Sequence, residues 1–427
     1  KAIIIGGGAA GLFAAGFLAK AGVDTTVIEH SDRTAKKVLI TGKGRCNVTN
    51  AGDMENLFAN VMTNEKFLYS AFYTYDNRMV MDFLEKAGCP LKVERGDRVF
   101  PVSDHSSDVI AAFQRELRSR DVEIVLDCGV KEILWKVSSA CESAGEESAS
   151  GKKDGPVALG VLLENGTKIM ADSVIVATGG ISYETTGSTG DGYRMAEALG
   201  HTIIEPKGSL VPLVSDDGCC GRMQGLALKN VELTVYNAKN KAVFREFGEM
   251  LFTHFGMSGP LVLSASAHLR DWDKGGYRVS IDLKPALDEQ KLDERILRDI
   301  AENPNRDADR VLSGLVPHSM VGVVMTRLGW SKGLKSHSVT KEQRRALIQL
   351  LKKFEISVRG VRPVSEAIVT AGGVKVGEVS PNTMESKLVS GLYFAGEVLD
   401  VDAYTGGFNL QIAWATAYAA GVSAAEK

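Results

Sequence analysis

The first thirty residues constrain the fold of this chain most strongly, because they place a glycine pattern between two apolar strands. Ala2–Ile5 and Val23–Ile28 are short apolar runs typical of buried parallel strands, and Ala9–Ala21 between them has helical spacing. Residues 6–11 read G-x-G-x-x-G at the turn into the helix. These glycines allow, in order, a tight turn, close approach of a pyrophosphate and close helix–strand packing. The segment therefore predicts a dinucleotide-binding βαβ unit.

An acidic residue follows the second strand at the position that such a unit requires. Glu29 can accept hydrogen bonds from a ribose diol and disfavours a 2′-phosphate. The helix that begins after Gly8 presents free N–H groups and the positive end of its dipole to a phosphate. NAD and FAD both fit this unit, so the opening segment leaves a nicotinamide dehydrogenase and a flavoprotein as alternatives.

Length and composition restrict the class of protein. A chain of 427 residues predicts two or three domains, and a net charge of −3 gives no global attraction to nucleic acid or to an anionic membrane. No apolar run is long enough for a transmembrane helix, and Lys1 leads straight into a strand, so we expect no signal peptide. Six cysteines without a C-x-x-C pattern predict reduced thiols in the cytoplasm. Seven scattered histidines predict no metal site.

The character of the chain changes at about residue 201 and changes back at about residue 362. Residues 1–200 and 362–427 are predicted to form one discontinuous domain, and residues 201–361 an inserted domain that is β-rich to about 285 and helical from about 286. The first domain is expected to contain a β-meander with a mobile polar loop, Ser138–Pro156. The other predicted elements are helices at Lys66–Gly88, Ser107–Arg120, Pro260–Leu269, Asp288–Gly329 (two or three) and Lys341–Lys353, strands at Val130–Val137, Val157–Leu163, Lys229–Tyr236, Ala242–Phe247 and Tyr277–Leu283, and a loop over GEMLFTHFGMSGP.

Two later stretches favour a flavin over a nicotinamide nucleotide. VIVATGG is an apolar strand that ends in small residues, which let the backbone approach a cofactor. GLYFAGEVLD is another strand that ends in small residues and is followed by acids. Its resemblance to the glutathione-reductase-like flavoprotein class implies that an acid here accepts a hydrogen bond from a ribityl hydroxyl of the flavin, a role that would fall to Glu397, with Asp400 and Asp402 as competitors. A final helix begins near Gly407 and can direct its positive end at the flavin pyrimidine edge. With no second nucleotide fingerprint, we expect one FAD in a single dinucleotide fold built from both chain ends.

Motifs along nearly the whole chain resemble the BaiN/aminoacetone-oxidase (YhiN-like) family of FAD-dependent flavoprotein oxidoreductases. They include IIGGGAAGLFAA, KKVLITGKGRCNVTN, DRVFPVS, ATGGISYETTGSTGDGYRMAEALGH, SLVPL, GEMLFTHFGMSGP, VTAGGV and TMESKLVSGLYFAGEVLDVDAYTGGFNLQIAWATAYAAG. The resemblance implies an α/β fold: a glutathione-reductase-like, Rossmann-type FAD-binding domain with an inserted β-barrel-like domain and a small helical subdomain. It also implies that Lys36, Thr41, Gly42, Arg45, Cys46 and Asn47 lie near the flavin.

The predicted site contains residues from each of these segments. His254 and Tyr404 are candidate catalytic residues, as acid/base groups or proton donors. The residues expected to contact FAD are Gly6, Gly8, Ala9, Ala10, Gly11, Glu29, His30, Lys36, Lys37, Thr41, Gly42, Gly44, Arg45, Cys46, Asn47, Val130, Ala177, Thr178, Gly179, Gly180, Gly396, Glu397, Asp400, Gly407, Phe408, Asn409 and Leu410.

Three functions remain open at this point. The first is hydride transfer from NAD(P)H through FAD to a C=C bond conjugated to a carbonyl, as in 3-oxo bile acids. The second is oxidation of an amine such as aminoacetone by O₂, which the missing nicotinamide fingerprint slightly favours. The third is an RNA-modifying or RNA-binding flavoprotein that uses the basic segment 327–362, where ten Lys and Arg stand against two acids. We expect a small-molecule substrate, no stable nucleic-acid partner and no membrane association.

Overall fold

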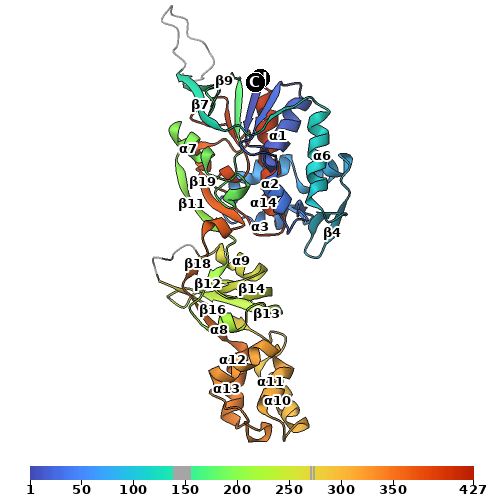
Figure 1. Ribbon diagram of the computed structural model, residues 1–427, viewed down its shortest axis with the longest axis vertical. Coiled ribbons are helices and arrows are strands. Elements are labelled where there is room, and N and C mark those ends of the chain that lie inside the picture. The colour runs from blue at the N-terminus through green and yellow to red at the C-terminus, as the bar shows by residue number, and fades with distance from the viewer. Residues whose placement is uncertain (138–154, 270–271, 273–274) are drawn as a thin grey trace, which may run out of the picture. The chain divides into compact units, whose positions relative to one another are not determined.

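The computed structural model describes residues 1–137, 155–269, 272 and 275–427, which form two compact units (Figure 1). Unit 1 contains Lys1–Ser209 and Ala367–Lys427, and unit 2 contains Leu210–Glu366. Most of the predicted loop Ser138–Pro156 lies outside the described residues. Among the residues that are described, no helix has the length and apolar character needed to cross a membrane.

A parallel five-stranded sheet at the centre of unit 1 joins the two ends of the chain. β1 pairs with β2 on one side and β10 on the other, and all four of its residues are buried. The full order is β20 (Leu392–Phe394), β10 (Ser173–Val176), β1 (Ala2–Ile5), β2 (Thr25–Ile28) and β6 (Glu123–Val125). The predicted dinucleotide fold, built from both chain ends, is confirmed.

Three helices pack together in unit 1: α1 (Ala9–Lys20), α14 (Phe408–Ala425) and α6 (Ser106–Arg118). α1, near the N-terminus, lies beside α14, at the C-terminus (Figure 1). Gly421 makes this approach close, since an added Cβ there would lie 2.9 Å from the Ala14 carbonyl oxygen. Trp414 is fully buried, and its ring centroid lies 5.2 Å from that of Phe13. Its indole N–H donates to the Val48 carbonyl oxygen at 2.8 Å.

One predicted helical region of unit 1 differs from the structure. The predicted helix Lys66–Gly88 is broken at Tyr75, because the Asp76 side chain caps a new helix by accepting from the Met79 N–H at 2.9 Å. The β-meander is present as three adjacent strands, β7 (Val130–Val137), β8 (Pro156–Leu163) and β9 (Lys168–Met170). Further elements are η1 (Glu65–Leu68), η2 (Glu184–Thr186), η6 (Val376–Glu378), η7 (Gly396–Val398), α2 (Lys36–Ile40), α3 (Met54–Ala59), α4 (Tyr69–Thr74), α5 (Asn77–Lys86), α7 (Asp191–Ala198), β3 (Thr49–Asn50), β4 (Leu91–Glu94), β5 (Arg98–Pro101), β11 (Ile203–Ser209) and β19 (Val369–Val374).

The strand β11 lies in unit 1, although the predicted inserted domain begins at residue 201. β11 pairs antiparallel with β19, the strand that follows unit 2 in the chain. The Ser209 hydroxyl at its end donates to the buried Asp402 carboxylate at 2.9 Å. These contacts join residues far apart in the chain, which a change in local composition does not reveal.

Unit 2 contains a seven-stranded antiparallel sheet and a group of helices. The predicted loop over GEMLFTHFGMSGP is wrong, because most of this segment is strand. β14 (Ala242–Thr253) turns directly into β15 (Gly256–Ser258), and Met250, Phe252 and Met257 are buried. The sheet order is β17 (Phe354–Val358), β16 (Tyr277–Asp282), β13 (Ala227–Tyr236), β14 (Ala242–Thr253), β15 (Gly256–Ser258), β12 (Leu213–Val214) and β18 (Gly360–Val361). The helices are α8 (Cys219–Arg222), α9 (Pro260–Ser266), α10 (Glu289–Glu302), α11 (Ala308–Leu315), α12 (His318–Leu328), η4 (Ser336–Ser338), α13 (Lys341–Lys352) and η5 (Val364–Glu366).

A buried histidine makes the stability of unit 1 depend on pH. The His201 side chain is 0% exposed, its Nε2 lies 2.9 Å from the Ser386 hydroxyl, and burial lowers its pKa below the usual 6.5. Below pH 6.5 the imidazole of His201 is protonated in the unfolded chain, whereas in the folded chain it stays neutral to a lower pH. Stability therefore falls as the pH drops from about 7 to about 5.

Urea denaturation at about pH 7 and about pH 5 measures the free energy of unfolding of the wild type and of His201→Gln. The glutamine variant is expected to lose less of its free energy of unfolding on acidification, since it has no proton to gain. The neighbouring Glu378 has a pKa lowered from 4.5, mainly by hydrogen bonds from Thr202 that outweigh its burial, so its own contribution is lost at lower pH. An identical pH response in the two proteins would contradict this account of His201.

Candidate functional site

The turn between β1 and α1 leaves the start of the helix open. Gly6 has φ of +104°, and an added Cβ there would lie 2.6 Å from the Ala177 carbonyl oxygen. Gly8 is the N-cap of α1 without a side-chain cap, and an added Cβ there meets nothing within 4 Å. The first turn of α1 contains no acidic residue. Its N–H groups and dipole thus form a site for an anion such as a pyrophosphate.

Glu29 is held in place at the end of β2. Its carboxylate accepts from the backbone N–H groups of Gly7 and Ser31, each at 2.8 Å. The imidazole of His30 lies 3.7 Å from Glu29 and 3.6 Å from Asp191. The Cys128 N–H donates to the Glu29 carbonyl at 3.1 Å, which brings the chain to Val130 two residues later. Contact of these residues with a ribose stays a prediction.

Three predicted cofactor segments meet beside the first turn of α1. An added Cβ at Gly396 would lie 2.9 Å from the Cβ of Ala10, and one at Gly180 would lie 3.1 Å from Glu397 Oε1. Gly6 contacts Ala177 as described above. The turn after β1, the turn after β10 and η7 are therefore adjacent, as expected where parallel strands end at one edge of a sheet.

The segment 36–47 contacts this edge through Lys37, whose Nζ donates to Glu397 Oε2 at 2.9 Å. Lys36 pairs with Asp32 at 2.6 Å instead. Arg45 pairs with Glu94 and Asp104 and lies over the Phe100 ring, 4.1 Å from its centroid, so its guanidinium is engaged within the protein. Contact between Arg45 and the cofactor stays a prediction.

The other residues of this segment form a tight turn. The Thr41 hydroxyl donates to the Lys37 carbonyl at 2.8 Å, and the Cys46 N–H donates to the Thr41 carbonyl at 2.9 Å. Gly42, Gly44 and Cys46 all have positive φ. Burial raises the pKa of the Cys46 thiol to about 12, so this thiol is not poised as a nucleophile.

The start of α14 is also open to an anion. Gly407 is its N-cap without a side-chain cap, the first turn contains no acid, and residues 408–410 supply its first N–H groups. The Asn409 amide is occupied in bracing the preceding loop, through the Ala403 N–H at 2.9 Å and the Ala403 carbonyl at 2.8 Å. Asp400, the predicted competitor of Glu397, is buried and accepts from Asn64 at 2.9 Å.

Two polar atoms at this edge have no hydrogen-bond partner among the described residues. They are Asn47 Oδ1 and Thr178 Oγ1, both buried. A buried polar atom without a partner is costly, and a bound polar ligand can satisfy it. Together with the open helix N-termini and the fixed carboxylate of Glu29, these atoms fit FAD.

The two candidate catalytic residues belong to different units. His254 is exposed in the turn between β14 and β15 of unit 2, with its ring 5.0 Å from that of Phe255. Tyr404 lies in unit 1 in the loop before α14, and its N–H donates to the Asn60 carbonyl at 3.0 Å. Their catalytic roles stay predictions.

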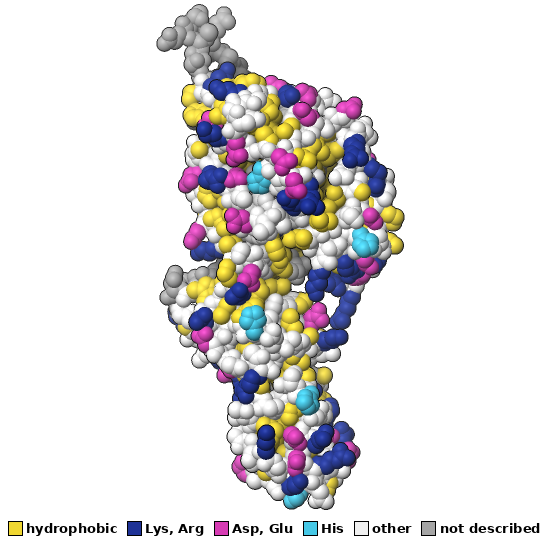
Figure 2. Space-filling view, viewed as in Figure 1, with side chains coloured by type: hydrophobic (Ala, Val, Ile, Leu, Met, Phe, Trp, Pro, Cys, Tyr) yellow, Lys and Arg dark blue, Asp and Glu magenta, His cyan; other side chains and the backbone are white. Residues whose placement is uncertain are grey.

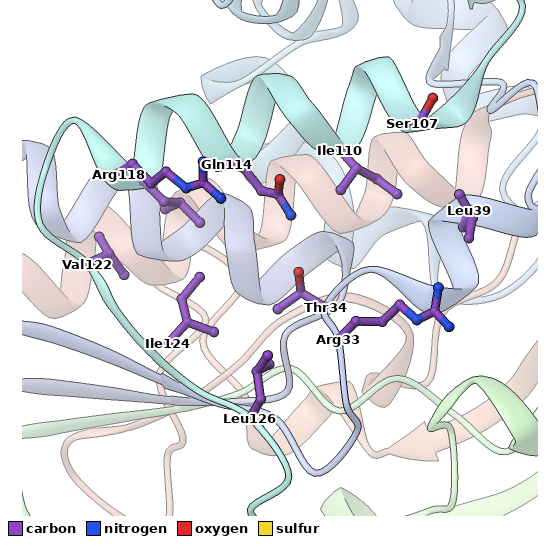
Figure 3. A pocket seen from close by; sticks show the side chains of 11 residues that line it. Arg33, Thr34, Leu39, Ser107, Ile110, Gln114, Arg118, Val122, Ile124 and Leu126 are labelled. Carbon is purple, nitrogen blue, oxygen red and sulfur yellow. The ribbon is translucent and has the colours of Figure 1, made fainter.

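A cavity of about 460 Å³ lies in unit 1 between α6, β6 and the segment before and within α2 (Figure 3). Its walls combine aliphatic side chains with two arginines and three neutral polar residues, and they contain no aromatic ring. None of its residues belongs to the predicted cofactor set. The lining is Arg33, Thr34, Leu39, Ser107, Ile110, Gln114, Leu117, Arg118, Val122, Ile124 and Leu126.

Sequence reasoning missed two residues that contact Glu397. The Ser182 hydroxyl donates to Glu397 Oε1 at 3.0 Å and the Thr370 N–H donates to the same oxygen at 2.8 Å. Ser182 stands two residues after ATGG, and Thr370 lies in the motif VTAGGV. The motifs mark both segments, but no local pattern shows that their residues converge on one carboxylate.

Comparison with known proteins shows the family and the fold to which this chain belongs. A sequence model of the HI0933-like protein Rossmann domain matches residues 1–423. The 3-dehydro-bile acid delta(4,6)-reductase of Clostridium scindens is 31% identical, over 99% of this chain and 98% of its own. A ribosomal RNA dihydrouridine synthase of Haemophilus influenzae is 32% identical, over 99% and 97%. The structure of 3-ketosteroid delta1-dehydrogenase from Sterolibacterium denitrificans shares the fold, with a TM-score of 0.51 at 13% identity over 100% and 99% of the two chains.

The match to the family covers residues 1–423, which include each of the predicted cofactor segments described above. The chain therefore belongs to the HI0933-like Rossmann family and is a flavoprotein oxidoreductase, which implies FAD as its cofactor.

Proposed function

We propose that the chain reduces a C=C bond conjugated to a carbonyl, with NAD(P)H as the source of electrons. The observation that carries this proposal is what the names of the two relatives have in common. In a 3-dehydro steroid the delta(4,6) double bonds are conjugated to the 3-oxo group. In uridine, the ring double bond that is saturated in dihydrouridine is likewise conjugated to a carbonyl. In the proposed reaction, saturation of one such C=C bond takes a hydride equivalent from NAD(P)H and one proton, and releases NAD(P)⁺.

The residues of this chain would bind the cofactor and position it. The first turn of α1 would hold the pyrophosphate, Glu29 the ribose, Glu397 a ribityl hydroxyl, and the first turn of α14 the pyrimidine edge. FAD, when bound, supplies two-electron redox chemistry. Tyr404 and His254 are the candidates for delivering the proton.

For the substrate we propose a small 3-oxo steroid of the bile-acid type. The ion pairing of the basic segment 327–362 supports this choice over RNA, because more than half of its Lys and Arg are already paired with carboxylates of the described residues. Six of its ten Lys and Arg form ion pairs with acids: Arg327–Asp217, Lys335–Asp307, Arg344–Asp293, Lys352–Asp282, Arg359–Asp216 and Arg362–Glu366. Over α10–α13, Figure 2 shows Lys and Arg side chains interspersed with Asp and Glu.

Uridine in ribosomal RNA is the second candidate substrate. The similarity to the Haemophilus enzyme favours it. Unit 2 also carries 24 Lys and Arg against 19 Asp and Glu, a net charge of +5 in a chain whose total is −3. A net positive unit attracts a polyanion at low ionic strength. Amine oxidation, the remaining alternative, stays a prediction.

An anaerobic two-step experiment tests the reaction. The FAD-loaded protein is mixed with NADH or NADPH, and we expect the visible flavin absorbance to be lost. A 4-en-3-oxo steroid acid or unmodified ribosomal RNA is then added in separate samples. Return of the absorbance with a product that has gained two hydrogens identifies the substrate. Bleaching by a primary amine but by neither nicotinamide would contradict the proposal and favour the oxidase.

A further inference from the structure

Three segments far apart in the chain hold the carboxylate of Glu397. Lys37 Nζ donates to Oε1 at 3.1 Å and to Oε2 at 2.9 Å. The Ser182 hydroxyl and the Thr370 N–H donate to Oε1 at 3.0 and 2.8 Å. Lys37 Nζ also donates to the Ser182 hydroxyl oxygen at 2.7 Å. These four residues are called the Glu397 cluster.

The two carboxylate oxygens of Glu397 differ in how many hydrogen bonds they already accept. Among the described residues, Oε1 accepts hydrogen bonds from Lys37, Ser182 and Thr370, whereas Oε2 accepts one from Lys37 only. The side chains of Lys37 and Glu397 are 25% and 22% exposed, while Ser182 is fully buried. Oε2 is thus the oxygen available to a ligand hydroxyl, and it lies beside a single ammonium group.

The surrounding backbone fixes this cluster at the cofactor edge. The Thr370 hydroxyl oxygen accepts from the N–H groups of Ile181 and Ser182 at 2.9 and 3.1 Å. An added Cβ at Gly180 would lie 2.2 Å from that hydroxyl oxygen. Because Gly396, the residue before Glu397, packs on the first turn of α1, the charge pair lies next to the proposed pyrophosphate site.

We propose that Lys37 and Glu397 are a matched charge pair whose opposite effects on the reduction of the bound flavin balance each other, with Ser182 and Thr370 as positioning residues. The proposal rests on FAD binding at this site. Reduction adds electrons to the flavin, so an unbalanced carboxylate nearby opposes it and an unbalanced ammonium favours it. With both charges present and close together, their effects on the flavin largely cancel.

A double-mutant cycle on the FAD-loaded protein tests this pair. The flavin reduction potential is measured by equilibrium with a reference dye, without substrate. Lys37→Met is expected to make reduction about tenfold less favourable and Glu397→Gln about tenfold more favourable, since a tenfold change corresponds to about 1.4 kcal/mol of charge interaction. The double variant returns close to the wild-type value, and so does Lys37→Arg, which keeps the charge.

Lys427→Met is the matched control. Lys427 forms an ion pair with Glu385 at 2.7 Å, with side chains 30% and 29% exposed. It lies 3.4 Å from the added-Cβ position of Gly391, at the start of β20, whereas Glu397 follows the end of that strand. Its loss should leave the potential unchanged.

Shifts of the same sign in Lys37→Met and Glu397→Gln, or no shift in either, would overturn the proposal. If Lys37→Met does not fold, a wild-type potential in the isosteric Glu397→Gln variant is sufficient to reject it. A protein that binds FAD and shows the opposed shifts, but reduces no C=C bond conjugated to a carbonyl, contradicts the proposed reaction alone. A chain that takes up no FAD contradicts both.

Discussion

Gly8→Asp is expected to yield a folded protein that does not retain FAD. Gly8 is the N-cap of α1 with ordinary negative φ, and a new Cβ there meets nothing within 4 Å. Aspartate is a favoured N-cap residue, so the free energy of unfolding of the apoprotein should change by less than about 0.5 kcal/mol. The same carboxylate faces the proposed pyrophosphate site, and the like charge should weaken FAD binding by about 100-fold or more.

Flavin content after reconstitution and gel filtration, together with urea denaturation of the apoprotein, separates these two effects. Gly218→Asp is the matched control, because Gly218 is also a helix N-cap, at α8, with no neighbour within 4 Å of an added Cβ. It should bind FAD as the wild type does. A yellow Gly8→Asp protein with full flavin content would contradict the placement of the pyrophosphate.

Gly11→Ala is expected to destabilise unit 1 severely, with or without cofactor. An added Cβ at Gly11 would lie 1.9 Å from the Gly6 carbonyl oxygen, which is backbone and cannot rotate away. α1 must therefore move off β1, and this loss of packing should cost about 3 kcal/mol of the free energy of unfolding.

Gly16→Ala in the same helix provides the comparison. Its new Cβ would make an ordinary 3.9 Å contact with Leu117, so alanine should gain up to about 1 kcal/mol through its higher helix propensity. Urea denaturation of the two apoproteins measures both changes. Equal stability of Gly11→Ala and the wild type would show that the helix and the strand are not packed as described.

The sequence predicts the parallel sheet well, because the residues that identify each of its strands lie within or next to that strand. The glycine turn, the apolar strands and Glu29 lie within a single βαβ unit, and β10 and β20 are recognisable from their own apolar residues and small residues at their ends. The break at Tyr75 was missed because it depends on one side-chain cap, that of Asp76. The extension of β14 was missed because its glycines and polar residues resemble those of a loop.

The contacts within the site were less predictable. Arg45 carries a charge suited to phosphate, yet Glu94, Asp104 and Phe100 engage it. These partners lie between 49 and 59 residues away, on or near strands whose pairing the local pattern does not specify. For the same reason Lys37 could be placed near the cofactor from its motif, while its pairing with Glu397 could not.

The central claim is that both ends of the chain form one binding site for FAD. Cofactor stoichiometry tests it most directly: purified protein is incubated with excess FAD, separated from free nucleotide and examined by its visible spectrum and by mass spectrometry of the released cofactor. The account predicts one FAD per chain. A protein that remains colourless, or one that releases a nicotinamide nucleotide instead, would contradict it.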